Sequence, residues 1–162
     1  MFRGTIKSNV GYGEGKEEIT VEDINKAIKI AQATDLVNSK ENGIYSEVSQ
    51  GGTNLSGGQR QRLSIARAIA KKPEILIFDD SFSALDYMTD KKLREEIKNQ
   101  IKDTTSLIVA QRIGTIKNAD LILVLDCGNV VGMGTHDELM ESCAVYKEIA
   151  YSQLSKEELD ND

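Results

Sequence analysis

The stretch LSGGQRQRLSIARA at positions 55–68 and the hexapeptide ILIFDD at positions 75–80 decide the fold that this sequence predicts. The first stretch places small and polar residues before apolar residues at helical spacing, which predicts a helix from about Gln59 to Lys71. Pro73 ends this helix, because proline cannot continue it. The hexapeptide begins with a continuous apolar run, which is typical of a parallel strand buried on both faces. Together the two segments predict an α/β fold.

The composition is that of an ordinary globular domain, and it excludes several classes of protein. The 162 residues are 40% hydrophobic and 28% charged. The longest uninterrupted apolar run, Leu121 to Leu125, is far shorter than the ~20 residues that a membrane span needs. The first residues lack the apolar region of a secretory signal. Cys127 and Cys143 are too few cysteines for a disulfide scaffold, and one histidine, His136, excludes a multi-histidine metal site.

The net charge of −6 is unevenly distributed. Residues 155–162 contain one lysine and four acids and so supply −3 of it. We expect this acidic tail to be solvated and disordered. The rest of the chain is near neutral, which argues against nucleic acid as a partner.

Patterns of apolar residues divide the chain into a helical part (1–72), an α/β part (73–154) and the acidic tail (155–162). In the helical part, Ile24, Ala27, Ile28 and Ala31 lie on one face of a helix that Thr20 and Asp23 cap. In the α/β part we expect three strands buried on both faces, at 75–78, 107–110 and 121–125, and a helix at 88–101 that connects the first two. We expect a hairpin turn at 126–129, a capping box formed by Thr135 and Glu138, and a last helix at 144–154. These elements predict a mostly parallel sheet with flanking helices.

Two adjacent carboxylates, Asp79 and Asp80, stand at the carboxyl end of the strand expected at 75–78. Ligands of open α/β sheets bind at that end. The pair could hold Mg²⁺ and orient a water, as a Walker B strand does in nucleotide hydrolases. The same two residues are also compatible with surface acids or a helix cap.

Ser56, Gly57, Gly58 and Gln59 form a candidate phosphate site at the start of the helix expected at 59–71. Small residues let backbone N–H groups approach a ligand closely, and a helix N-terminus carries about half a positive charge. Ser56 adds a hydroxyl and Gln59 an amide, so this helix start suits a phosphate. The alternative is a Gly-Gly loop before a solvated basic helix, because no acid interrupts the basic residues that follow: Arg60, Arg62, Arg67, Lys71 and Lys72.

At this point the sequence resembles the ABC-type ATPases. Positions 55–68 are similar to their signature motif, positions 75–80 to their Walker B strand, and Ser83-Ala84-Leu85-Asp86 to their D-loop, with order and spacing in agreement. The resemblance covers most of the chain. Three further stretches resemble exporter-type members. Residues 2–10 are similar to their segment after the Q-loop, residues 47–52 to their X-loop, and residues 134–139 to their late Gly-x-His-x-Glu-Leu stretch.

The resemblance implies a partial P-loop NTPase fold with a helical signature subdomain. It also implies that two such domains hold two ATP molecules, each between the Walker motifs of one domain and the signature of the other. Ser56, Gly57, Gly58 and Gln59 would then contact ATP held by a second nucleotide-binding domain, and Asp79 would bind Mg²⁺. ATP and Mg²⁺ are expected only in the complete dimer. The assembly would sit at the cytoplasmic face of the cell membrane with the transmembrane domains of an exporter, whereas the isolated chain would be soluble and cytoplasmic.

The sequence departs from the family pattern most strongly at the P-loop. No Gly-x-x-x-x-Gly-Lys-Ser/Thr motif occurs in the 162 residues. The nearest candidate, Gly15-Lys16, is followed by Glu17, and we interpret Gly11 to Lys16 as an ordinary turn. We therefore interpret the chain as the C-terminal part of a nucleotide-binding domain. Since P-loop donors supply most of the affinity for triphosphate, we expect the isolated chain to be inactive and to bind ATP weakly.

Two further departures concern the expected catalytic residues, Asp80 and Gln111. Asp80 occurs where the family has Glu, and its side chain is one methylene shorter. Gln111 occurs at the H-loop position, where the family has His, and glutamine can hydrogen-bond a phosphate but carries no charge near neutral pH. His136 cannot replace it, because we expect this histidine to be an exposed surface residue. Both departures weaken hydrolysis at the chain's own site, whereas its signature is intact, which favours a heterodimer with one degenerate and one competent site.

Three functional interpretations follow. The first is an ATP-binding fragment of an ABC exporter, which couples ATP binding and hydrolysis to transport. The second is a fragment of a non-transport ABC ATPase, for example of a DNA-maintenance or translation factor. The third is a catalytically inactive remnant or interaction module, because the P-loop is missing from these residues. The exporter-like segments favour the first over the second.

Overall fold

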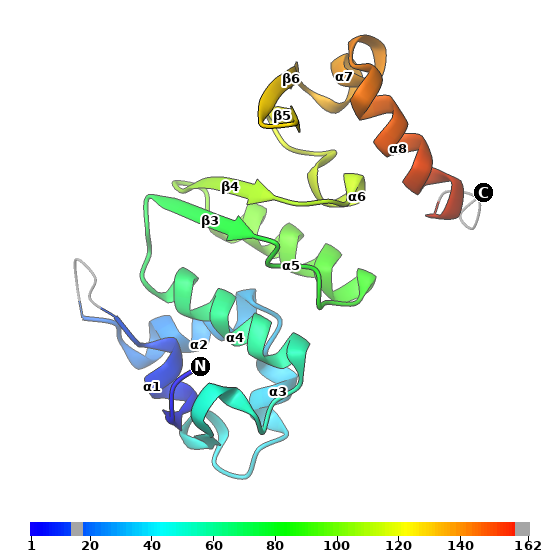
Figure 1. The fold of residues 1–162 in the computed structure, drawn as a ribbon. Helices are drawn as coiled ribbons and strands as arrows, with labels where there is room; N and C mark the ends of the chain where they lie inside the picture. The colour runs from blue at the N-terminus through cyan, green and yellow to red at the C-terminus, as the bar shows by residue number, and fades with distance from the viewer. Residues whose placement is uncertain (14–17, 158–162) are drawn as a thin grey trace. The chain divides into compact units, whose positions relative to one another are not determined.

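The computed structural model describes residues 1–13 and 18–157, and the chain forms two compact units (Figure 1). The first unit is Met1–Val109 and the second unit is Ala110–Asp162. The subdomain boundary predicted between residues 72 and 73 falls inside the first unit and stays a prediction. Part of the turn expected at 11–16 and the last five residues of the acidic tail lie outside the described residues. No helix in the described ranges is both long and apolar enough to cross a membrane.

The N-terminal part of the first unit is mainly helical, as the sequence predicts. Helix α4 packs against both α1 and α2, and the two short strands β1 and β2 pair antiparallel. The elements in chain order are β1 Gly4–Thr5, α1 Ile6–Val10, α2 Val21–Ile30, α3 Thr34–Asn38, the 3₁₀ turn η1 Gly43–Tyr45, β2 Glu47–Val48, the 3₁₀ turn η2 Gln50–Gly52, and α4 Gly57–Ala70.

The predicted apolar face and capping pair of α2 are both confirmed. Ile24, Ala27 and Ile28 are buried in the core of the first unit. At the start of the helix, the Asp23 N–H donates to Thr20 Oγ1 at 3.1 Å and the Thr20 N–H donates to Asp23 Oδ2 at 3.1 Å. These two bonds satisfy N–H groups that have no partner inside a helix.

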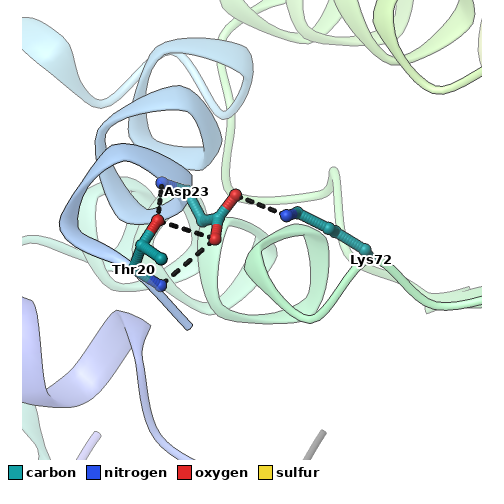
Figure 2. Close-up of polar contacts among 3 residues, drawn as sticks. All are labelled: Thr20, Asp23 and Lys72. Carbon is teal, nitrogen blue, oxygen red and sulfur yellow. Dashed lines mark hydrogen bonds and ion pairs between the residues drawn. The ribbon is translucent and has the colours of Figure 1, made fainter. Parts of the chain in front are cut away.

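Figure 2 shows that Asp23 also reaches Lys72, two residues after the end of α4. Lys72 Nζ lies 2.7 Å from Asp23 Oδ1. The bond with Lys72 and the bonds from Thr20 stabilise the ionised carboxylate and lower the pKa of Asp23 from 3.8 to about 2. One half-buried carboxylate therefore caps α2 and ties it to the end of α4.

An arginine and a buried asparagine tie the N-terminal segment to α4. Arg67 Nε donates to the Asn9 carbonyl at 2.6 Å, and Arg67 Nη2 donates to Asn9 Oδ1 at 2.9 Å. Asn9 Nδ2 donates in turn to the carbonyls of Phe2 and Thr5. The rings of Phe2 and Tyr12 lie 5.2 and 5.8 Å from the guanidinium, within cation–π range. Arg67 is therefore held by the chain's own N-terminal segment.

Strands β3 (Ile75–Asp79) and β4 (Thr105–Val109) form a parallel pair connected through α5 (Tyr87–Gln100), as predicted. The prediction that these strands are buried on both faces is wrong. Leu76 and Phe78 point into the core of the first unit. The opposite face carries four side chains that are 51 to 65% exposed: Ile75, Ile77, Leu107 and Val109. Successive side chains of a strand point to opposite faces, and the described residues cover only one of the two.

The second unit consists of α6 Ile113–Ile116, β5 Ile122–Asp126, β6 Asn129–Gly134, α7 His136–Ser142 and α8 Ala144–Glu157. The predicted hairpin is confirmed, with positive φ at both turn residues, 47° at Cys127 and 80° at Gly128, as a type I′ turn requires. The expectation of a mostly parallel sheet is met only by β3 and β4. The third apolar run pairs with β6 instead, because so short a turn can join only antiparallel strands.

The C-terminal helices confirm one prediction and correct two. Thr135 and Glu138 form the predicted capping box of α7, and α8 continues to Glu157, three residues beyond its predicted end. The prediction that His136 is an exposed surface residue is wrong. It is half-buried, and its Nδ1 lies 2.8 Å from the hydroxyl of Tyr146, which α8 packs against α7. Burial raises the pKa of Tyr146, because the ionised form of its hydroxyl is disfavoured away from water.

The carboxylate of Asp23 predicts a specific loss of stability in acid. Because its pKa is about 2 in the folded protein and 3.8 in the reference state, its contribution is complete above about pH 4 and disappears as the pH falls through about 2. We expect the urea midpoint of the unsubstituted chain to fall more steeply between pH 4 and pH 2 than that of Asp23→Asn. Glu22→Gln, in the same turn but exposed, is the control and should keep the steep fall. Identical pH profiles for Asp23→Asn and the unsubstituted chain would contradict this assignment.

Candidate functional site

Helix α4 starts with a capping box formed by Ser56 and Gln59. The Gln59 N–H donates to Ser56 Oγ at 3.2 Å, and the Ser56 N–H donates to Gln59 Oε1 at 2.9 Å. Ser56 is therefore the N-cap, and the first helical residue is Gly57, two residues before the predicted start. Each of the two side chains therefore accepts a hydrogen bond from the backbone N–H of the other residue.

The capping box leaves Gly57 and Gly58 as the outward-facing donors of this helix start. They occupy the first two helical positions, whose N–H groups have no acceptor inside the helix. Gly57 is exposed and Gly58 is half-buried. No side chain beyond Cα covers either amide, so an anion can approach both closely. The 14 residues of α4 add the positive end of an aligned set of peptide dipoles.

The arginines that follow in α4 do not form a free basic surface. Arg60 Nη1 donates to the Leu55 carbonyl at 2.7 Å, and Arg62 Nη1 donates to the carbonyl of Gln32. Arg67 binds Asn9, as described above. Each guanidinium therefore holds a loop or the N-terminal segment against α4, and the helix start offers uncharged amides rather than arginine side chains.

Asp79 and Asp80 stand where the sequence predicts them, at the carboxyl end of β3, and both are exposed. The Asp80 N–H donates to the Val109 carbonyl at 3.2 Å, which continues the pairing with β4. Asp80 has a φ of 47°, in the left-handed region that few residues other than glycine adopt. The chain therefore turns sharply at Asp80 and leaves the sheet.

The turn after Asp80 is closed by hydrogen bonds to main-chain carbonyls. Ser83 Oγ and the Ser83 N–H donate to the Asp80 carbonyl at 3.0 and 3.4 Å, and Ser81 Oγ donates to the Asp79 carbonyl at 3.3 Å. Phe82 is buried, with its ring 5.2 Å from that of Phe78. A hydrophobic side chain therefore anchors this turn below the two exposed carboxylates.

The predicted D-loop residues, Ser83 to Asp86, lie against the start of α4. A Cβ added to Gly58 would stand 3.1 Å from the Ala84 carbonyl oxygen, closer than almost all real contacts of this kind. Leu85 is buried beside it. Asp86 caps α5, since its Oδ1 accepts a hydrogen bond from the Thr89 N–H at 3.0 Å. Hydrogen bonds from the Thr89 side chain and backbone lower the pKa of Asp86.

Sequence reasoning missed one residue of this site, Gln61. Its carboxamide donates to the Asp80 carbonyl at 3.2 Å and accepts from the Ala84 N–H at 3.1 Å. Gln61 thus connects α4 to both the end of β3 and the D-loop. A polar residue on a helix carries no pattern that could have revealed this role, because its partners are main-chain groups about twenty positions away.

Gln111 belongs to the second unit, whereas Asp80 belongs to the first. Its side chain is exposed, and its carbonyl accepts a hydrogen bond from Gln153 Nε2 at 2.7 Å. Gln153 Oε1 also accepts from the Ile113 N–H at 2.8 Å. Gln153, on α8, therefore hydrogen-bonds to the backbone of both neighbours of Arg112.

The arrangement fits part of an ATP–magnesium site. The amides of Gly57 and Gly58 suit a phosphate, and the exposed carboxylates of Asp79 and Asp80 are hard oxygen ligands of the kind that Mg²⁺ prefers. No group of three or more His, Cys, Asp or Glu side chains suited to a metal occurs within 1–13 and 18–157. The described residues alone therefore supply separate pieces of such a site.

The two glycines at the start of α4 predict a matched pair of stability effects. A Cβ at Gly57 would make an ordinary 4.0 Å contact with Ala84 Cβ, whereas a Cβ at Gly58 would press on the Ala84 carbonyl. Since alanine is favoured over glycine in helices by up to about 1 kcal/mol, we expect Gly57→Ala to raise the urea midpoint. We expect Gly58→Ala to gain less or to lower it. Equal gains in both variants would show that α4 and the D-loop are not in close contact.

The chain is similar in sequence to known proteins. Residues 3–83 match the protein family described as ABC transporter. The chain is 43% identical over 154 residues to an uncharacterized ABC transporter ATP-binding protein of Mycobacterium bovis, and 45% identical over 157 residues to one of Bacillus subtilis, YfiB. A Rickettsia felis protein named as an export ATP-binding/permease protein is 41% identical over 155 residues. These matches cover 94, 97 and 96% of the chain but only 26, 27 and 27% of the relatives.

The chain is also similar to a solved structure, that of a bacterial Atm1-family ABC exporter with ATP bound. The TM-score is 0.85 at 34% sequence identity, and the match covers 92% of this chain and 26% of that chain. In both sequence and structure, therefore, the chain spans about a quarter of the length of the relatives it matches.

Proposed function

The chain belongs to the ABC transporter family, and from this premise we propose that it is the part of an exporter's ATP-binding domain that completes a partner's ATP site. In this proposal, Ser56, Gly57, Gly58 and Gln59 contribute the signature that contacts ATP held by a second ATP-binding domain. The chain has the α/β fold of such domains, and relatives named for ATP binding and for export support the proposal.

The backbone amides of Gly57 and Gly58 carry this proposal. They lie at the positive end of a 14-residue helix. The close approach of Gly58 to the Ala84 carbonyl and the capping box of Ser56 and Gln59 hold them in place. Preorganised N–H donors need no rearrangement when a phosphate arrives. Because the arginines of α4 bind main-chain carbonyls, contact with phosphate at this helix start rests on uncharged donors.

At the chain's own ATP site we propose a degenerate set of residues. Asp79 would hold Mg²⁺, Asp80 would orient the attacking water, and Gln111 would hydrogen-bond the terminal phosphate. When bound, Mg–ATP supplies the phosphoanhydride bond that ABC transporters hydrolyse. The carboxylate of Asp80 is one methylene shorter than that of glutamate, and a misplacement of about 1 Å can slow a reaction about 10²-fold. Gln111 cannot carry a proton charge near neutral pH.

This combination favours a heterodimer at the cytoplasmic face of the membrane. In a homodimer, the intact signature of each chain would face an ATP site that hydrolyses ATP poorly. In a heterodimer, the signature would face the ATP site of a different partner that has a complete set of catalytic residues. Transmembrane domains would be driven by the closure of the pair. The alternative of an inactive interaction module is favoured only for these 162 residues alone, because they contain no P-loop motif.

The test of the proposed function replaces the matching segment of the Bacillus subtilis relative with this chain. In the purified chimera, Gly57→Glu should lower ATP hydrolysis by about 10² or more, because a carboxylate at the helix start repels phosphate while it suits the helix dipole. ATP with Mg²⁺ should also slow amide hydrogen exchange in residues 55–61. The control is Ser64→Glu, which adds the same charge at an exposed position of α4 and should leave hydrolysis unchanged.

Normal hydrolysis by the Gly57→Glu chimera would contradict the proposed signature. The chain by itself should not saturate with a fluorescent ATP analogue and Mg²⁺ at micromolar concentration, since it lacks P-loop donors. Saturation there would contradict the assignment of ATP to a shared site.

The degenerate site is tested by restoring the family's residues. In the same chimera, Asp80→Glu combined with Gln111→His should raise hydrolysis at this site by about 10². Asp137→Glu, at an exposed position of α7, adds the same methylene outside the site and should change nothing. No gain in the double variant would refute the interpretation that Asp80 and Gln111 limit hydrolysis.

A further inference from the structure

We propose that Gln61 is a positioning residue that makes the helix start at Ser56–Gln59 and the carboxylate of Asp80 move as one body. This inference deepens the proposed function and rests on it for the chemistry at the two ends. The connection itself is a property of the folded chain and needs no nucleotide.

The geometry of the Gln61 side chain supports this role. Gln61 lies in the second turn of α4, directly below the backbone amides of Gly57 and Gly58, and is half-buried. Its Nε2 donates to the Asp80 carbonyl at 3.2 Å, and its Oε1 accepts from the Ala84 N–H at 3.1 Å. Both ends of the carboxamide are therefore used, on two main-chain groups that flank the turn after β3.

Few other side chains could make these two bonds. One atom must donate and another must accept in the same plane; the carboxamides of Gln and Asn do both without a charge, and among planar side chains only the neutral ring of His does so as well. Glutamate would lack the donor and the cationic side chains would lack the acceptor. The bridge is thus specific for an amide of this length.

The Asp80 backbone depends on such support. Its φ of 47° lies in the left-handed region, where a residue other than glycine is held only by its surroundings. Its carbonyl accepts from Gln61 and from Ser83, and its N–H donates to Val109. Without the Gln61 donor, the Asp80 carbonyl keeps only contacts within its own turn.

A second contact brings α4 close to the D-loop. The Cα of Gly58 packs so closely on the Ala84 carbonyl that a Cβ there would be 3.1 Å from it. The absence of a Cβ at Gly58 thus allows the close approach, and Gln61 adds two hydrogen bonds beside it. A displacement of the Gly57 and Gly58 amides is therefore transmitted to Ala84 and Asp80.

The first test uses the nucleotide-free chain and NMR of the Ala84 amide. Gln61→Met keeps the side-chain length and loses both bonds, so the Ala84 amide should exchange with solvent about 3- to 10-fold faster, and its proton resonance should move upfield. Gln61→Glu keeps an acceptor for this amide and should keep its slow exchange. Gln100→Met, an exposed glutamine at the end of α5, is the matched control and should leave Ala84 unchanged.

Unchanged Ala84 exchange in Gln61→Met would overturn the proposal, as would an equal acceleration of all amides in the first unit. If the Met variant fails to fold, Gln61→Asn decides: it shortens the carboxamide by one methylene, so unchanged Ala84 exchange in that variant would also overturn the proposal.

The second test separates positioning from binding in the chimera described above. Gln61→Met should lower kcat for ATP while KM stays within about twofold, because Asp80 is misplaced and the phosphate donors are kept. A raised KM with unchanged kcat would overturn the proposal. If the chimera shows no hydrolysis and no protection of residues 55–61 by ATP, the proposed function fails, yet the NMR result on the free chain still decides whether Gln61 forms the bridge.

Discussion

The arrangement of the first unit depends on one interaction, the packing of the first two turns of α4 against the loop that follows β3. Gly58 lets the two backbones meet, and Gln61 hydrogen-bonds across them. Below them, Phe78, Phe82 and Leu85 fill the core of the first unit. This packing holds a helix start and a strand end together although about twenty residues separate them in the sequence. Both parts of the candidate site are therefore preorganised by the same contact.

The charges of α4 act mainly within the protein. Arg60, Arg62 and Arg67 each donate to a main-chain carbonyl, and these bonds hold the loop before α4, the turn after α2 and the N-terminal segment. The ion pair between Asp23 and Lys72 connects the start of α2 to the end of α4. Phosphate recognition at the helix start, as we propose it, is consequently left to uncharged amides, whose direction is set by the helix.

In the function that we propose, the chain contributes residues to two different ATP sites, and this would explain its chemical asymmetry. The helix start with Gly57 and Gly58 is complete in itself, because a capped helix N-terminus needs only its own residues. The acidic end of β3 is incomplete, because the described residues place no third metal ligand beside Asp79 and Asp80. The apolar face of β3 and β4 is likewise uncovered by the described residues. We therefore regard the chain as one contributor to a composite assembly.

The sequence by itself determined the local elements and the family. Spacing and capping patterns predicted α2, α4, α5, β3 and the hairpin of β5 and β6, because each depends on neighbours within a few positions. It did not determine which strand faces are covered, the partner of His136 or the bridge of Gln61. These depend on packing between elements far apart in the chain. Ile77 is exposed because no other described part of the first unit lies over it, and His136 meets Tyr146 only because α8 folds onto α7. Gln61 could be recognised only once the tertiary structure placed Asp80 and Ala84 against α4.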